Sequence, residues 1–503
     1  MAATGAKTYR NYIGGEWVDA VGGETFETRD PATGEVLGVF PRSTDEDMDR
    51  AVAAAAAAYE RWRLVPAPKR AEILFRVAQA FVERKAELAE EMVREMGKVR
   101  FEAEGDVQEA IDMTYYMAGE GRRMFGATTP SELPDKWCMS TRNPVGVVGA
   151  ITPWNFPIAI PSWKIAPALV CGNTVVFKPA EDTPLLAERF VEIFEQQGLP
   201  PGVLNIVHGA GETVGAHLVR HPDVPLISFT GSRETGMLVT QNAAPELKHV
   251  HLELGGKNAV IVMDDADLDL SVDGIVWSAF GTTGQRCTAA SRVIATGRVY
   301  DELCSRLAGA AEGLRLGHGL EPDTDVGPLI NEAALEKVHS YTEVGRDEGA
   351  KLLTGGEPAR GDGLERGFFY RPTVFADVDP EMRIAQEEIF GPTTALIRAS
   401  DVDEAIRIAN GVRFGLSSSI FTRDVNRAFK AMRDLKTGIT YVNAGTTGAE
   451  VHLPFGGMKD TGNGHREAGQ AALDFYTEWK SIYVDYSGRL QRAQIDTIEH
   501  PSP

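Results

Sequence analysis

Residues 146–178 read GVVGAITPWNFPIAIPSWKIAPALVCGNTVVFK, and they carry the clearest sign of the fold. The run over 147–152 is apolar almost throughout, which is typical of a strand buried on both faces. The segment 163–171 has a helical pattern, and 174–178 is a second apolar strand that ends in a lysine. A strand, a helix and a strand in this order predict a parallel βαβ unit.

The same alternation continues on both sides of this unit. Helices are expected over 45–62, 70–95, 101–117, 184–197 and 270–281, and further strands over 204–207, 226–229 and 259–262. The alternation of expected strands and helices begins again after Glu253. The sequence therefore predicts an α/β fold with two doubly wound α/β domains in tandem.

The composition is that of a globular chain with a strong negative charge. The 503 residues are 43% hydrophobic and 24% charged, and the formal net charge is −21. This charge argues against nucleic acid or an anionic membrane as a partner. No apolar run approaches the ~20 residues that a membrane span needs, and the N-terminus lacks the apolar core of a secretory signal.

The four cysteines include no CxxC pair and predict no disulfide framework, so a cytoplasmic location is expected. The ten histidines are scattered, and the sequence predicts no metal site. His249 and His251 lie two apart on an expected strand, and both are interpreted as structural.

Two segments carry the chemistry. Cys287 lies in the small-residue stretch FGTTGQRCT over 280–288, and Glu253 lies beside a glycine pair in LELGGK over 252–257. A thiol nucleophile with a carboxylate base is the equipment for oxidising an aldehyde through a thioester. A free cysteine on its own is more often a small buried hydrophobe, and the flanking patterns favour the catalytic interpretation.

Asn155 lies between aromatic residues and prolines in TPWNFP over 152–157. Its amide NH₂ suits a developing oxyanion. It could equally cap its own turn.

Several further segments are candidates for binding. Gly231 and Ser232 follow an apolar strand and open a helix, which suits a pyrophosphate. Lys178 and Glu181 follow another strand and could hold ribose hydroxyls, which favours NAD over NADP, although a solvated ion pair is the plainer alternative. The Gly-rich loop over 443–450 could present backbone N–H groups to a carboxylate, or be an ordinary turn.

Together these motifs resemble the aldehyde dehydrogenase superfamily, from about Tyr12 to about Tyr486. The resemblance implies that Cys287 is the nucleophile, that Asn155 and the Cys287 N–H hold the oxyanion, and that Glu253 activates water. It implies NAD contacts at Thr152, Trp154, Lys178, Glu181, Gly231, Ser232, Gly255, Glu388 and Phe390. An aldehyde and water would be the substrates.

The resemblance also implies a domain plan. A Rossmann-like NAD-binding domain would comprise 1–125 and 145–253, and a catalytic domain 254–452. A small β arm over 126–144 and 474–487 would join subunits into a homodimer or homotetramer. The tail over 488–503 is either a frayed end or a segment that crosses the interface and covers a substrate entrance.

The substrate class is left open by the sequence. Pieces such as DVQE over 106–109 and TGAE over 447–450 are similar to the aminoadipate-semialdehyde (antiquitin) branch, which implies that Glu109, Arg286, Gly448 and Ala449 hold an amino-acid head group. The segments around Trp154 and over 451–454 are more typical of broad-range or pyrroline-carboxylate enzymes, and Arg286 could simply support its loop. A structural cofactor-binding protein and a thiol esterase are the alternatives from other classes.

Overall fold

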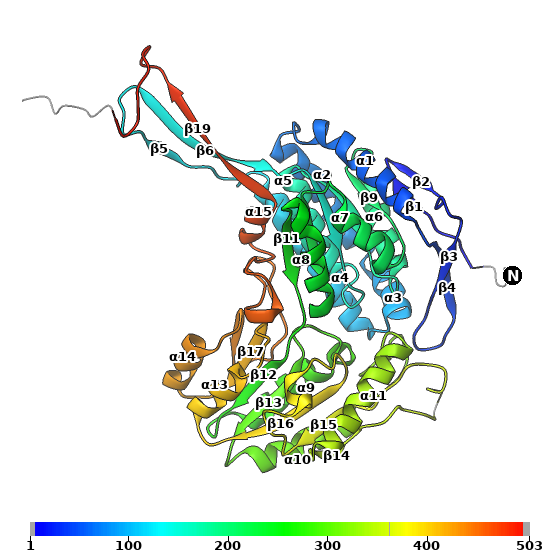
Figure 1. The fold of residues 1–503 in the computed structure, drawn as a ribbon. Helices are drawn as coiled ribbons and strands as arrows, with labels where there is room; N and C mark the ends of the chain where they lie inside the picture. Colours follow the sequence, from blue (N-terminus) through cyan, green and yellow to red (C-terminus); the bar gives the residue numbers. More distant parts are fainter. Residues whose placement is uncertain (1–5, 362, 496–503) are drawn as a thin grey trace, which may run out of the picture.

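The computed structural model describes residues 6–361 and 363–495, and it contains two seven-stranded sheets and a projecting arm (Figure 1). The first sheet has the order β11-β10-β7-β8-β9-β1-β2. Its parallel strands are β11 (His249–Glu253), β10 (Leu226–Thr230), β7 (Val147–Ile151), β8 (Thr174–Lys178) and β9 (Leu204–Ile206). The short strands β1 (Asn11–Ile13) and β2 (Glu16–Val18) complete one edge in antiparallel pairing. Beside them, β3 (Thr25–Arg29) and β4 (Val36–Pro41) form a separate hairpin.

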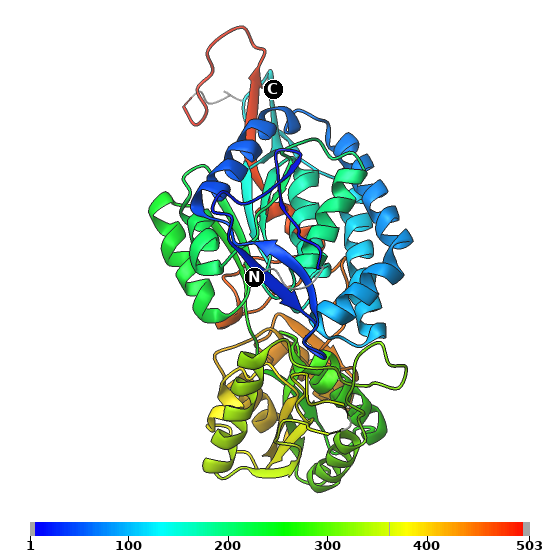
Figure 2. The same cartoon turned by 90° about the vertical axis from the view of Figure 1, so that its right-hand side faces the viewer.

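Helices cover both faces of the first sheet (Figure 2). Val147 and Ile151 of β7 pack into the core that contains α1 (Asp45–Trp62), α7 (Ala216–Arg220) and α8 (Arg233–Ala243). Val148 and Ala150 pack on the other face, with α2 (Ala67–Glu83), α3 (Lys85–Met96), α4 (Arg100–Glu120), α5 (Ala159–Cys171) and α6 (Pro184–Gln196). This alternation is the period of a strand buried on both faces.

The second sheet repeats this plan with the order β14-β15-β16-β13-β12-β17-β18. Its strands are β14 (Lys351–Thr354), β15 (Thr373–Ala376), β16 (Thr393–Ala399), β13 (Ala290–Thr296), β12 (Asn258–Val262), β17 (Ser417–Phe421) and β18 (Ile439–Val442). On one face lie α9 (Leu268–Phe280) and α10 (Tyr300–Glu312), and on the other α11 (Glu332–Asp347), α13 (Val402–Asn410) and α14 (Val425–Asp434). Only β14 runs antiparallel among these described strands. The α/β fold expected from the sequence is confirmed.

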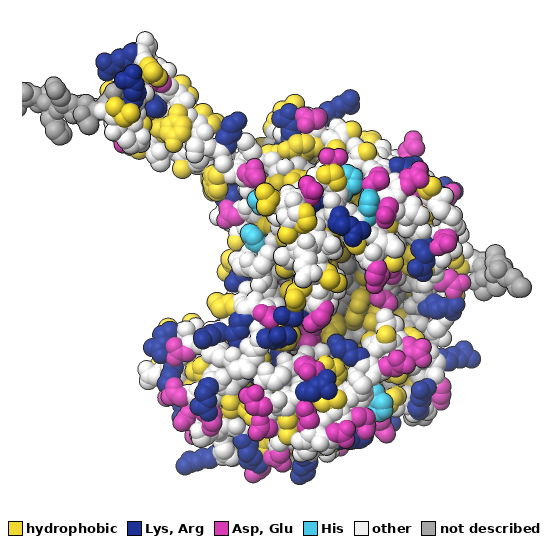
Figure 3. Space-filling model, viewed as in Figure 1, with side chains coloured by type: hydrophobic (Ala, Val, Ile, Leu, Met, Phe, Trp, Pro, Cys, Tyr) yellow, Lys and Arg dark blue, Asp and Glu magenta, His cyan; other side chains and the backbone are white. Residues whose placement is uncertain are grey.

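The arm is a three-stranded antiparallel sheet of β5 (Thr128–Pro130), β6 (Lys136–Pro144) and β19 (Thr477–Asp485). Figure 3 shows hydrophobic side chains on its surface, and Trp137, Trp479 and Tyr483 are each more than half exposed. The described start of the tail folds back on the arm, where Gln491 donates to the Pro134 carbonyl at 2.7 Å. The role expected for the tail stays a prediction, and residues 496–503 lie outside the described part.

Two local expectations differ from the structure. The expected helix over 70–95 is two helices, α2 and α3, because Arg84 leaves helical geometry at φ −100° and ψ 8°. The helix expected from residue 163 begins at Ala159, whose N–H donates at 2.8 Å to a carboxylate from another helix, Asp106.

Two short helices complete the α-helices of the described residues, α12 (Arg383–Gln386) and α15 (Ala471–Phe475). Within residues 6–361 and 363–495, no helix is both long and apolar enough to cross a bilayer.

Candidate active site

The candidate residues follow the carboxyl ends of parallel strands. Asn155 comes after β7, Lys178 ends β8, Ser232 comes after β10 and Glu253 ends β11. Carboxyl ends of neighbouring parallel strands share one edge of a sheet, which is where open α/β sheets bind their ligands. The first sheet therefore presents one carboxylate, one amide and two cofactor candidates along a single edge.

Cys287 lies after a tight turn over Gly281–Gly284 that links α9 to β13. Thr282 and Thr283 both have left-handed backbone, with φ of 51° and 56°, which is uncommon for branched residues. Glu102 of α4 holds the turn, because its carboxylate accepts from the Thr282 N–H at 2.8 Å. Gly284 also has positive φ, and a Cβ there would lie 2.1 Å from the Gly391 carbonyl oxygen. The turn is strained and is held by contacts from distant segments.

The glycine pair before β12 approaches Cys287 from the other side. A Cβ on Gly256 would lie 2.5 Å from the Cys287 carbonyl oxygen, so only glycine fits. Asn258 donates to the same oxygen at 2.7 Å and to the Ala289 carbonyl at 2.9 Å. Burial raises the pKa of the Cys287 thiol, and the Glu253, Glu388 and Glu109 carboxylates raise it further. The thiol is therefore protonated at rest and needs a base.

Glu253 is buried without the usual partners of a carboxylate. Neither of its oxygens has a hydrogen-bond partner among the described residues. Burial raises its pKa well above the usual range, and the Glu467 carboxylate raises it further. Gly456 leaves room for it, because a Cβ there would lie 2.7 Å from Glu253 Oε1. A buried carboxyl group whose charged form is disfavoured in this way is a candidate for proton transfer.

Asn155 is buried, and its Nδ2 donates to the Gln285 carbonyl at 3.0 Å. This bond fixes the amide beside the segment that ends in Cys287. An amide NH₂ has two donors, so one remains for another acceptor. The oxyanion role expected for Asn155 stays a prediction.

Two cavities meet at Cys287. The larger has a volume of about 380 Å³, and its walls include Glu253 and the four residues expected to bind substrate, Glu109, Arg286, Gly448 and Ala449. The smaller, of about 240 Å³, is lined by Asn155 and by six of the expected cofactor residues, Trp154, Gly231, Ser232, Gly255, Glu388 and Phe390. The residues common to both are Ile160, Thr230, Leu254 and Cys287. Cys287 therefore belongs to the walls of both cavities.

In the smaller cavity, Glu388 accepts from the Gly256 N–H at 2.8 Å, and a Cβ on Gly255 would lie 2.2 Å from its carboxylate. Burial raises the pKa of Glu388. The Trp154 and Phe390 rings meet edge to face at 5.6 Å. The first turn of α8 is capped by Ser232, whose Oγ accepts from the Thr235 N–H at 3.2 Å.

The remaining expected cofactor residues lie on the first sheet. Lys178 Nζ is 2.9 Å from Glu181 Oε2, and Glu181 Oε1 accepts from the Gly211 N–H at 2.8 Å. Thr152 is buried at the end of β7, and its N–H donates to the Lys178 carbonyl at 3.3 Å. These contacts place Thr152, Lys178 and Glu181 side by side.

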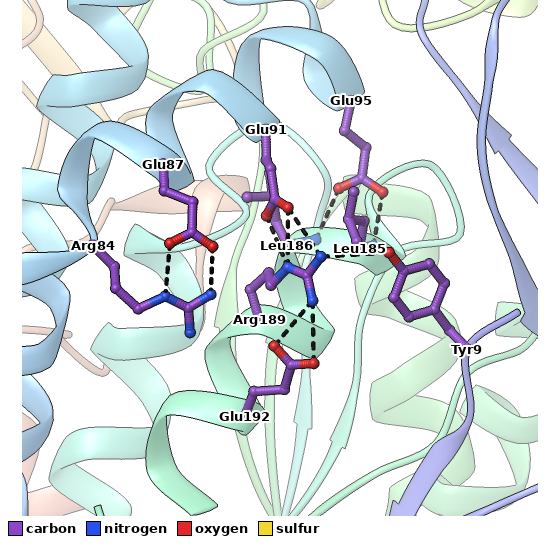
Figure 4. A network of polar contacts seen from close by, with 9 residues as sticks. All are labelled: Tyr9, Arg84, Glu87, Glu91, Glu95, Leu185, Leu186, Arg189 and Glu192. Atoms are coloured by element: carbon purple, nitrogen blue, oxygen red, sulfur yellow. Dashed lines mark hydrogen bonds and ion pairs between the residues drawn. The ribbon is translucent and has the colours of Figure 1, made fainter. Parts of the chain in front are cut away.

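A polar network fixes the helix that follows Lys178 and Glu181 (Figure 4). Glu95 of α3 accepts from the N–H groups of Leu185 and Leu186 at 2.7 and 2.9 Å, in the first turn of α6. Burial raises the pKa of Glu95 to about 8. One turn along, Arg189 pairs with Glu91 of α3 at 2.9 Å. The loop that carries the expected ribose contacts is thus anchored to α3.

Arg286 lines the larger cavity and also supports its own loop. Its Nη2 lies 2.9 Å from Glu102 Oε1, its Nε donates to Thr282 Oγ1 at 2.9 Å, and its guanidinium lies 4.5 Å from the centre of the Trp277 ring. Burial and the nearby Asp106 carboxylate raise the pKa of Glu109 to about 8. The supporting role left open by the sequence is present, and substrate binding by either residue stays a prediction.

Sequence reasoning missed the polar residues around Glu253. The interpretation of His251 as structural did not foresee that its ring lies 3.3 Å from Glu253 Oε1. Lys164 of α5 forms an ion pair with Glu467. A lysine inside the apolar run over 158–171 was a visible signal, because a buried lysine needs a partner.

Comparisons with known proteins point to one family. The aldehyde dehydrogenase family pattern matches residues 17–482. Alpha-ketoglutaric semialdehyde dehydrogenase of Bacillus subtilis is 42% identical over 482 residues, which cover 96% of this chain and 99% of that protein. Malonate-semialdehyde dehydrogenase 1 of Geobacillus thermodenitrificans is 44% identical over 482 residues, which cover 95% and 99%.

A solved structure extends the likeness to three dimensions. Betaine aldehyde dehydrogenase of Staphylococcus aureus, in complex with NAD+, superposes with a TM-score of 0.94 at 36% identity, covering 96% of this chain and 95% of that one. The superfamily resemblance drawn from the sequence motifs is confirmed. The chain belongs to the aldehyde dehydrogenase family.

Proposed function

We propose that this protein oxidises an aldehyde to the carboxylic acid with NAD+, through a thioester on Cys287. The observation that carries this proposal is the position of Cys287 in the wall of both cavities. A carbon bonded to its sulfur would be next to the base Glu253 on one side and next to the cofactor candidates on the other. Such proximity is a main source of catalytic power.

The smaller cavity fits a nicotinamide nucleotide. Gly231 and Ser232 open α8, where a pyrophosphate is favoured by free N–H groups and the helix dipole. The Glu388 carboxylate suits ribose hydroxyls, and Gly255 leaves the space that a Cβ would fill. The Glu181 carboxylate disfavours a 2′-phosphate, which supports NAD over NADP. When bound, NAD+ supplies the hydride acceptor.

The first half-reaction begins with transfer of the thiol proton from Cys287 to Glu253. The pKa of the Cys287 thiol is raised, so the thiol needs a base, and it gives its proton to Glu253, which lines the same cavity. The sulfur then bonds to the aldehyde carbon, and the oxygen becomes an oxyanion. The free donor of Asn155 and the Cys287 N–H stabilise this charge. Loss of hydride leaves the thioester.

The second half-reaction needs Glu253 again. Its carboxylate takes a proton from water, and the water oxygen bonds to the thioester carbon. The carbon–sulfur bond then breaks, which releases the carboxylic acid and the Cys287 thiolate. Glu253 thus accepts two protons in each turnover, one from the thiol and one from water.

The substrate is proposed to be a semialdehyde that carries a carboxylate. The curated relatives carry such names, alpha-ketoglutaric and malonate semialdehyde dehydrogenase. On the cavity wall, the backbone at Gly448 and Ala449 can donate to a carboxylate, whereas the Arg286 charge is shared with Glu102. An amino-acid semialdehyde held by Glu109 is the narrower alternative.

The test is NADH formation from a panel of propanal, benzaldehyde, malonate semialdehyde and an amino-acid semialdehyde. We expect wild type to form NADH and Cys287→Ala to form none, with kcat/KM highest for an acidic semialdehyde. NADH formation by Cys287→Ala would contradict the assignment of Cys287 as the nucleophile. A higher kcat/KM for propanal than for the semialdehydes would contradict the proposed substrate class. Hydrolysis of a nitrophenyl ester without NAD+, and no NADH from any aldehyde, would favour a thiol esterase.

We also propose that the arm assembles subunits. Its exposed Trp137, Trp479 and Tyr483 are an apolar surface that an isolated chain would leave in water. Analytical ultracentrifugation of the wild type should show a dimer or a tetramer. The substitution Trp479→Glu should shift the oligomeric state toward monomer. A wild-type monomer at micromolar concentration would contradict this.

A further inference from the structure

His251 lies between two carboxylates. It precedes Glu253 by two residues on β11, so both side chains point to the same face of the strand. Its Nε2 lies 3.3 Å from Glu253 Oε1, and its Nδ1 lies 3.6 Å from Glu467 Oε1. The ring is buried, and within the described chain neither nitrogen has a hydrogen-bond partner.

Buried imidazole nitrogens without partners are unusual and call for an explanation. Here both nitrogens are within a short side-chain movement of a carboxylate oxygen. A neutral imidazole can accept a proton at one nitrogen while the other donates a hydrogen bond. The geometry therefore suits a ring that gains a proton while a carboxylate on its far side stabilises the charge.

The groups around the ring bear on its charge. Lys164 pairs with Glu467 and donates to Ser228 Oγ at 3.1 Å. The Phe475 ring lies 4.7 Å away, and that of His465 lies 5.7 Å away. Burial, then Lys164, His465 and Arg466, lower the pKa of His251 well below its usual range. The ring is thus neutral at rest, and the carboxylates of Glu253 and Glu467 beside it are the groups that would stabilise an added proton.

The chemistry of the site creates a need for such a group. Glu253 must take a proton from the Cys287 thiol and later a second one from water. A carboxylate that keeps the first proton cannot accept the second. The first proton must therefore leave Glu253 while the thioester is present.

We propose that His251 holds the first proton as an imidazolium between Glu253 and Glu467 while Glu253 accepts the second from water. This inference rests on the proposed function. The S–H bond of Cys287 breaks as the Glu253 O–H bond forms, and that bond breaks in turn as Nε2–H forms. After hydrolysis, the proton taken from water passes from Glu253 to the Cys287 thiolate. The proton on His251 is the one that the overall oxidation releases to solvent.

The test compares His251→Gln with His249→Gln by stopped-flow NADH absorbance. Glutamine keeps a polar amide of similar reach but cannot take up a proton. In His251→Gln we expect the rapid first NADH to remain while kcat falls on the order of 10- to 100-fold, because hydrolysis waits for Glu253 to lose its proton. The matched control His249 is half exposed on the same strand and pairs with Glu478 at 3.3 Å, so kcat should be unchanged.

A pH series separates proton storage from a structural role. As pH rises, Glu253 can lose its proton to solvent, so the kcat deficit of His251→Gln should shrink. A deficit that stays constant with pH, or a variant that turns over like wild type, would overturn the inference. A second variant, His251→Asn, is measured in the same way. The melting temperatures of both variants show whether a loss of activity comes from a folding defect. If wild type itself forms no NADH from any aldehyde, the proposed function fails instead.

Discussion

Glu102 and Glu253 are two buried carboxylates that line the larger cavity, and their surroundings differ sharply. Glu102 accepts from the Thr282 N–H and pairs with Arg286 at 2.9 Å. Glu253 has no hydrogen-bond partner in the described part of the chain. A buried charge that is fully paired holds structure, whereas one left unpaired can change its protonation state. The difference supports a structural role for Glu102 and the proposed catalytic role for Glu253.

The largest effect should come from Glu253→Gln, which removes the acid assigned to chemistry. Loss of a general base typically costs 10²–10⁴ in rate, so we expect kcat to fall on the order of 10³-fold. The free energy of unfolding should stay level or rise, because an unpaired buried carboxyl is replaced by a neutral amide. Urea denaturation and steady-state NADH formation measure both. A marked loss of stability would break the comparison.

Glu102→Gln should behave in the opposite way. It leaves Arg286 buried without its carboxylate, and breaking a buried pair on one side costs about 3–5 kcal/mol. Urea denaturation should show a loss of about 3 kcal/mol, with activity lost in step as the Thr282 turn loosens. The matched control is Glu104→Gln on the same helix, which should change stability by less than about 0.5 kcal/mol. Equal stability of the two variants would contradict the assignment.

Glu95 is an intermediate case and should give the smallest effect. It accepts two backbone N–H groups, but burial still raises its pKa to about 8. The folded-state pKa is above that of the unfolded chain, near 4.5, so its stabilising contribution is present at low pH and is lost as pH rises toward 8.

In Glu95→Gln this pH dependence should be absent. Between pH 5 and 6.5, wild type should lose on the order of 2 kcal/mol more stability than the variant. Urea titrations at three pH values provide the measurement. Parallel curves for the two proteins would show that the two backbone bonds outweigh burial, and Glu95 would then belong with Glu102.

Much of the fold could be predicted from local patterns. The strand expected over 174–178 is β8, and the helix expected over 45–62 is α1, because continuous apolar runs and helical spacing are local signals. The break at Arg84 was not visible, since the apolar spacing continues through it. The start of α5 was missed because Asp106, from another helix, caps it.

The candidate active site also has a part that local motifs predict and a part that they do not. The flanking motifs singled out Cys287 and Glu253, and the structure places both in one cavity. The partners that set their protonation were not predictable, because Glu467 and Glu102 reach the site from segments far away in the chain. Pairing of this kind is set by tertiary packing, which no local pattern records.

The root of the arm has a mechanical consequence. Phe475 packs against the His251 ring, Tyr476 donates to Ser228 Oγ at 3.2 Å, and the very next residue, Thr477, begins β19. The strand that is proposed to join subunits is therefore continuous with the segment that packs against His251. If the arm assembles subunits as proposed, we expect dilution to monomers to slow the second half-reaction more than it weakens NAD+ binding.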